Sequence, residues 1–161
     1  MRFYGFGNYY LSSLQQGLQS AHVVGELFTT YNRLTEKYSQ VHDWAQNHKT
    51  MVLLNGGNSK DLAELFDFFN QENNPYAFAK FHEDEQSLNG ALTYVGIVLP
   101  SKIYDASANM RLFTHFYNPV TEELRLDLKP EGFTENTSEI ISLSQFDYNL
   151  CERLNCYGLA K

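Results

Sequence analysis

The chain has 161 residues, of which 43% are hydrophobic, and its formal net charge at pH 7 is −7. This length suits one folded domain and is short for two, and the apolar content excludes a disordered chain. The acidic balance, without a cluster of Lys or Arg, argues against a general nucleic-acid binder, because such proteins neutralise phosphates with basic side chains. No apolar run reaches the length of a membrane span and no leader opens the chain, so we expect no membrane partner and a cytoplasmic location.

The first predicted element is a strand over residues 2–8, where Phe3, Tyr4 and Phe6 favour an extended backbone. A helix follows over residues 11–28, and Ser12 with Gln15 forms the pattern of a capping box at its start. Apolar and small residues recur along this helix with a helical period. They predict the side that faces the core, which comprises Leu14, Leu18, Ala21, Gly25 and Phe28.

The next segment, residues 31–46, is predicted to remain helical and carries Trp44. Residues 50–54 are a short, continuous apolar run, which is typical of a buried central strand. The turn at residues 55–58 leads into a helix that Asn58 or Ser59 caps. The apolar side of this helix is predicted to comprise Leu62, Leu65, Phe66 and Phe69.

Two further strands are predicted over residues 76–81 and 91–99, with a polar loop over residues 82–90 between them. The order of elements in residues 1–100 predicts an α/β core, which is a small mixed four-stranded sheet with helices packed on it.

Residues 101–161 are predicted to form a C-terminal extension packed on this core, made of a β-hairpin and a helix. The strands of the hairpin fall at residues 112–117 and 122–128. A loop over residues 129–138 then leads to a final helix, which Ser144 begins as the first member of a second capping box.

Other patterns give weaker indications of chemistry. Gly5 and Gly7 precede a helix, but the third glycine of a dinucleotide-binding loop is missing. The turn at residues 55–58 could hold an anion at a helix N-terminus, but a plain turn is the favoured interpretation, because no Lys or Ser/Thr follows at the spacing of a phosphate-binding loop. The five histidines lack the spacing of metal ligands, and we interpret Cys151 and Cys156 as reduced structural residues. We therefore predict no metal and no cofactor.

A more informative constellation joins the first helix to the loop before the last core strand. Gln19, His22 and Glu26 are helical neighbours and form a polar stripe. The carboxylates of residues 83–85 end the third strand, and Thr93 begins the fourth. Strand ends beside a helix are where small sites form in open α/β sheets, and crowded carboxylates can perform acid–base chemistry there. A solvated acidic loop beside a polar helix surface is the alternative interpretation.

These residues resemble the type-2 peptidyl-tRNA hydrolases, and more closely their short bacterial and phage-borne relatives. That family opens with a strand and a helix carrying Gln-x-x-His, which Gln19 and His22 match. A Trp ahead of the second strand is matched by Trp44, and a Phe-x-Glu-Pro-Asp segment before a Leu-Thr strand resembles residues 81–85 and Leu92-Thr93. The resemblance spans residues 2–99.

The resemblance implies hydrolysis of the ester between a peptide and tRNA, with tRNA as a partner. It implies Glu85 or Asp84 as the group that activates water, Thr93 as a further catalytic residue, and Gln19 and His22 as residues that bind the substrate. The family carries a lysine-rich run before its Gln-x-x-His helix, where this chain has residues 13–15, Ser-Leu-Gln.

A second interpretation therefore stays open: a catalytically inactive relative, encoded by a phage, that acts as an accessory factor binding a protein or a small ligand. A nucleotide-linked hydrolase on the same scaffold is a third.

Overall fold

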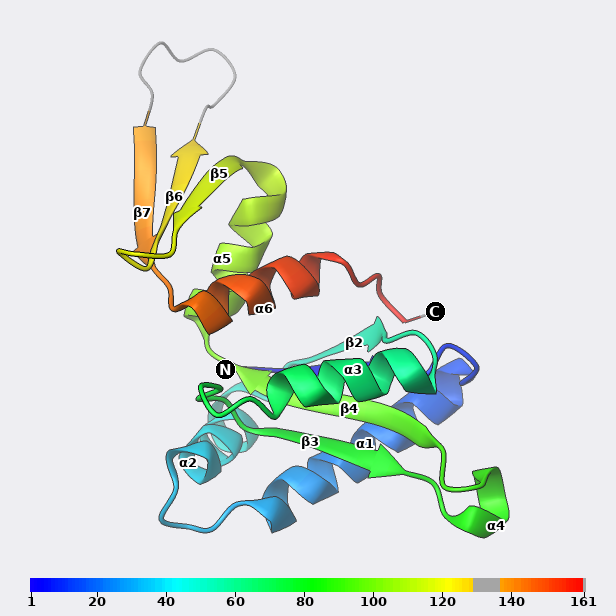
Figure 1. The fold of residues 1–161 in the computed structure, drawn as a ribbon. Helices are drawn as coiled ribbons and strands as arrows, with labels where there is room; N and C mark the ends of the chain where they lie inside the picture. Colours follow the sequence, from blue (N-terminus) through cyan, green and yellow to red (C-terminus); the bar gives the residue numbers. More distant parts are fainter. Residues whose placement is uncertain (129–136, 161) are drawn as a thin grey trace. The chain divides into compact units, whose positions relative to one another are not determined.

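The computed structural model describes residues 1–128 and 137–160 (Figure 1). The chain divides into two compact units. The first comprises Met1–Pro100 together with the described residues of Tyr157–Lys161, and the second comprises Ser101–Cys156. Each unit has its own sheet, and the two are taken in turn below.

The first unit is built on a mixed four-stranded sheet, which confirms the predicted α/β fold. Its strands are β1 (Arg2–Gly7), β2 (Met51–Asn55), β3 (Phe78–His82) and β4 (Leu92–Leu99), in the order β2-β1-β4-β3. β1 runs parallel to β2, and β4 runs antiparallel to both β1 and β3. All eight residues of β4 are buried, as expected of a central strand covered on both faces.

The prediction that residues 50–54 form a central strand is wrong, because β2 lies at the edge of the sheet. Only Leu54 in this strand is buried. The outer edge of β2 is covered by the C-terminal segment: the N–H of Asn55 donates to the carbonyl of Gly158 at 2.9 Å, and the N–H of Ala160 donates to that of Leu53 at 3.0 Å. The continuous apolar run therefore belongs to an edge strand, whose outer backbone groups pair with the C-terminal segment.

Helix α1 (Ser13–Thr30) covers one face of the sheet, and the Ser12–Gln15 capping box at its start is confirmed. The predicted core-facing side is wrong. Leu14, Leu18 and Phe28 are 75%, 55% and 38% exposed. The buried side lies on the opposite face of the helix and comprises Gln16, Gln19, Ser20, Val23 and Leu27. Gln16 and Gln19 can be buried because residues at the end of the sheet offer them hydrogen-bond partners, and Ser20 donates to the carbonyl of Gly17 in its own helix.

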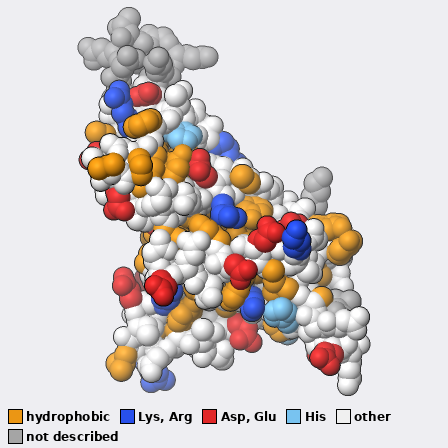
Figure 2. Space-filling model, viewed as in Figure 1, with side chains coloured by type: hydrophobic (Ala, Val, Ile, Leu, Met, Phe, Trp, Pro, Cys, Tyr) orange, Lys and Arg blue, Asp and Glu red, His pale blue; other side chains and the backbone are white. Residues whose placement is uncertain are grey.

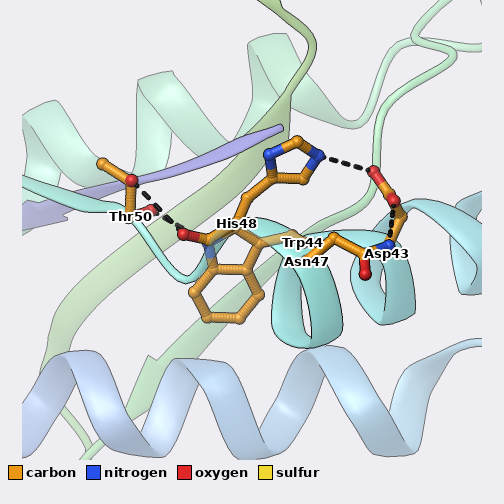
Figure 3. A network of polar contacts seen from close by, with 5 residues as sticks. All are labelled: Asp43, Trp44, Asn47, His48 and Thr50. Atoms are coloured by element: carbon orange, nitrogen blue, oxygen red, sulfur yellow. Dashed lines mark hydrogen bonds and ion pairs between the residues drawn. The ribbon is translucent and has the colours of Figure 1, made fainter.

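The predicted helix over residues 31–46 is interrupted after α1. Helix α2 spans Glu36–Asp43, and a π-helical turn, η1, spans Trp44–His48 (Figure 3). Trp44 packs on Phe3 with ring centroids 5.6 Å apart, and its indole N–H donates to the carbonyl of Thr50 at 2.8 Å. This turn therefore fixes the start of β2 next to β1.

Helix α3 (Ser59–Phe69) covers the opposite face of the sheet. Asn58 is its N-cap, as predicted. The predicted apolar side of α3 is also confirmed: Leu62, Leu65 and Phe69 are buried, and Phe66 is partly buried. The predicted polar loop after β3 contains one short helix, α4 (Glu85–Leu88).

The second unit contains α5 (Ser101–Leu112) and α6 (Gln145–Asn155) together with an antiparallel sheet of order β5-β6-β7. The predicted hairpin is confirmed as β5 (Thr114–Asn118) and β6 (Glu123–Leu128). α5 and β7 (Thr137–Ser142) are elements that the sequence did not predict. Most of the predicted loop over residues 129–138 lies outside the described residues.

The final helix begins as predicted, with Ser144 and Asp147 forming a capping box. Both cysteines are free thiols. Cys151 is buried on α6, whereas Cys156 is exposed just after the helix. The packing of this extension on the core stays a prediction.

Candidate functional site

At one end of the sheet of the first unit, β1 and β3 end and β4 begins (Figure 1). Asn8 follows β1 and ties this end together. Its backbone N–H donates to the carbonyl of Thr93 at 2.9 Å, and its side-chain amide donates to the hydroxyl of Ser59 at 3.1 Å. Ser59 in turn donates to the carbonyl of Leu92 at 3.0 Å. These bonds fix the first turn of α3 beside the start of β4, and Nε2 of Gln16 in α1 donates to the carbonyl of Asn8 at 3.0 Å.

A chain of hydrogen bonds links three segments of the sequence at this end. The hydroxyl of Thr93 donates to Oε1 of Gln19 at 3.0 Å, and Nε2 of Gln19 donates to Oε1 of Glu83 at 2.5 Å. Gln19 and Thr93 are 7% and 2% exposed, whereas Glu83 is only partly buried. The amide of Gln19 therefore orients a carboxylate that solvent or a ligand can still reach.

His22 lies beside this chain at the exposed rim of α1. Its ring stacks on that of Phe81, with centroids 4.3 Å apart and an angle of 8° between the planes. Because Phe81 belongs to β3, the stack holds the imidazole next to the strand end that carries Glu83. The structure thus brings together Gln19, His22 and Thr93, which the sequence singled out.

The two carboxylates that the sequence favoured lie in the following loop. Glu85 is exposed and begins α4, and Asp84 is exposed, with its carbonyl accepting from the N–H of Gly90 at 3.2 Å. Sequence reasoning passed over Glu83 as a site residue. A register shift between Phe81 and His82 precedes this loop, and no pattern in the sequence announces that shift.

Two buried polar atoms beneath the cluster have no hydrogen-bond partner among the described residues: Oε1 of Gln16 and the hydroxyl of Tyr94. Burial also raises the pKa of the Tyr94 phenol, which keeps it protonated. Leaving such groups unpaired costs free energy, about 1–3 kcal/mol each.

A groove of about 600 Å3 adjoins the cluster along β3. It is lined mostly by aromatic and charged residues of α1, α2, α3 and β3, chiefly Glu26, Tyr31, Lys37, Phe66, Phe78, Lys80, Phe81 and His82. Burial lowers the pKa of Lys37, the more enclosed of its two lysines. On the face that Figure 2 shows, charges of both signs are interspersed with hydrophobic side chains.

Within the described residues there is no group of three or more His, Cys, Asp or Glu side chains placed to hold a metal ion. The same part of the chain contains no helix long and apolar enough to cross a membrane.

No protein-family model matches the sequence, and no curated protein matches it either.

Proposed function

We propose that this protein is a peptidyl-tRNA hydrolase-like enzyme, which cleaves the ester bond between a peptide and tRNA. The observation that carries the proposal is the hydrogen-bond chain from Thr93 through Gln19 to Glu83. It joins a helix glutamine, a strand threonine and a loop carboxylate, the three kinds of residue that the resemblance associates with this reaction. The ring of His22 stacks on that of Phe81 beside them.

In this proposal Glu83 is the group that activates water. Its carboxylate takes a proton from a water molecule while the water oxygen attacks the ester carbonyl carbon. The bond to the ribose oxygen then breaks, and the proton passes to that oxygen, which releases a free peptide acid and tRNA. Gln19 holds the carboxylate in place, Thr93 fixes the amide of Gln19, and His22 offers a flat surface and a ring N–H to the substrate.

A peptidyl-tRNA cleavage assay tests the proposal directly. Glu83→Gln should lower kcat about a hundredfold or more, because it removes the general base but keeps the shape of the side chain. Asp84→Asn and Glu85→Gln test the carboxylates that the sequence favoured, and each should change kcat less than Glu83→Gln does. Glu72→Gln is the matched control, since this exposed residue precedes β3 instead of following it. An absence of turnover by the wild-type protein at micromolar concentration would refute the proposal.

A second candidate function is a binding factor without catalysis. It is favoured by residues 13–15, which are Ser-Leu-Gln where the resembling enzymes carry lysines, and by the exposure of Leu14 and Leu18 on the same helix. Without a cation there, phosphate binding and the stabilisation of a developing oxyanion both lose a contribution. Two results would support this second function: the protein binds peptidyl-tRNA without cleaving it, or it binds a protein partner and Leu14→Lys abolishes that binding.

A further inference from the structure

The outer edge of β3 offers backbone groups for another strand. The carbonyl of Ala77 accepts from the N–H of Val98 at 2.8 Å, so the alternation of an antiparallel pair directs the N–H and C=O of Phe78 and Lys80 away from β4. Tyr31 already fills the first of these positions: its hydroxyl accepts from the N–H of Phe78 at 2.9 Å and donates to its C=O at 2.7 Å. At Lys80, no described residue binds the outward N–H and C=O.

The groove along this edge carries two cations without a carboxylate partner. The ammonium of Lys80 lies 4.2 Å from the centre of the Phe66 ring, and that of Lys37 lies 5.0 Å from the centre of the Phe78 ring. Neither lysine forms an ion pair with a described residue. Lys37 is partly buried, and a carboxylate from outside would offset the cost of removing its charge from water.

The two faces of β3 differ in chemistry. Phe78 and Lys80 face α3, as their contacts with Phe66 show. Phe81 alternates with them and faces α1, where it stacks on His22. A strand added at this edge would therefore place one set of side chains beside a lysine and the other set beside an aromatic ring.

We propose that this groove binds an extended segment of a partner protein with alternating acidic and apolar side chains, which adds to the edge of β3 as an antiparallel strand. The residue opposite Lys80 is acidic and exchanges both backbone hydrogen bonds with it, and its apolar neighbours lie beside Phe81. The proposal does not depend on hydrolase activity.

A second copy of this chain is a poorer occupant. Symmetric antiparallel pairing of two β3 edges centred on Lys80 would set the two lysines directly opposite each other, and like charges in that position repel. Single-stranded RNA is also a poorer occupant, because it has no peptide backbone to pair with the N–H and C=O of a free strand edge.

The test uses a fluorescein-labelled hexapeptide that alternates Asp and Val, with fluorescence polarisation as the readout. A peptide of the same composition with its three Asp residues grouped together should bind about tenfold more weakly, because it cannot match both faces of β3. N-methylation of the Asp residues should weaken binding by about tenfold or more, whereas N-methylation of the Val residues should change it less than about twofold. These probes change only the ligand and leave the protein fold untouched.

Protein variants supply the second arm. Lys80→Glu should weaken binding of the Asp–Val peptide about tenfold and favour a Lys–Val peptide instead. Lys60→Glu is the matched control: it makes the same charge change on α3 at a side chain that is 83% exposed and outside the groove. The emission of Trp44, the only tryptophan, reports that each variant is folded.

Several outcomes would overturn the proposal. One is that the Asp–Val peptide does not bind at about 1 mM. Others are that both sets of N-methylated peptides lose affinity equally, or that Lys80→Glu and Lys60→Glu change the affinity equally. A further one is that oligouridylate displaces the peptide. The last of these would identify a nucleic-acid groove.

Discussion

Glycine-to-alanine substitutions at two positions should change the stability of the first unit in opposite directions. A Cβ at Gly96, in β4, would lie 2.5 and 2.6 Å from Cε2 and Cζ of Phe3 and 2.8 Å from Cγ1 of Val23. Ordinary carbon contacts lie near 3.5–4.0 Å, and both neighbours are fully buried. Phe3 cannot move away freely, because it packs on Trp44.

We expect Gly96→Ala to lower the free energy of unfolding by about 1–3 kcal/mol, the usual cost of overpacking a core. At Gly25, inside α1, an added Cβ meets nothing within 4 Å. Gly25→Ala should therefore raise the free energy of unfolding by about 0.5–1 kcal/mol, since alanine loses less backbone entropy than glycine in a helix.

Urea unfolding followed by the emission of Trp44 measures both effects in the unit that carries them. With an m-value of about 2 kcal/mol/M, each kcal/mol moves the midpoint by roughly 0.5 M. A midpoint for Gly96→Ala equal to that of the wild type would refute the close contact between β4, Phe3 and α1. A loss for Gly25→Ala as large as that for Gly96→Ala would refute the exposure of that side of α1.

Three further predictions follow from burial. Leu18→Lys should change the urea midpoint by less than the equivalent of about 0.5 kcal/mol, whereas Leu27→Ala should cost about 2–4 kcal/mol, because only Leu27 faces the core. Iodoacetamide should alkylate Cys156 quickly and Cys151 slowly, since burial raises the pKa of the Cys151 thiol to about 12. Mass spectrometry that showed the Cys156→Ser variant to be labelled as fast as the wild type would contradict this. Burial, followed by the hydrogen bond to Glu152, raises the pKa of Tyr148 to about 12. The contribution of this side chain to stability should therefore be present below pH 10 and be lost as the pH rises through 12. Ultraviolet titration of the wild type against Tyr148→Phe checks the pKa.

Local chemistry was readable from the sequence. The capping boxes at Ser12 and Ser144 and the cap at Asn58 each use side chains within three residues of the backbone that they bind, so a short window contains the whole interaction. The α/β class, the hairpin of β5 with β6 and the apolar side of α3 likewise follow from periodicity. α5 was missed, since its buried residues, Ile103, Ala106, Ser107 and Met110, give a weak apolar pattern.

The candidate site was predicted in part, because some of its residues form a pattern that is visible in the sequence. Gln19, His22 and Thr93 carry a recognisable pattern of residue types, and the structure places them together. The carboxylate that joins them is Glu83, which directly follows a register shift between β3 and β4. That shift comes from the pairing of two strands, so it is invisible in either strand alone.

The sequence by itself determined where the capped helices α1, α3 and α6 begin, because a cap acts over a few residues. Only the tertiary structure decided which side of α1 is buried. The apolar stripe of Leu14, Leu18 and Phe28 faces solvent, while Gln16 and Gln19 lie against the sheet. Burial of a polar side chain costs little only where it has a hydrogen-bond partner. The fold brings the partners of these two glutamines to α1: Asn8, Glu83 and Thr93.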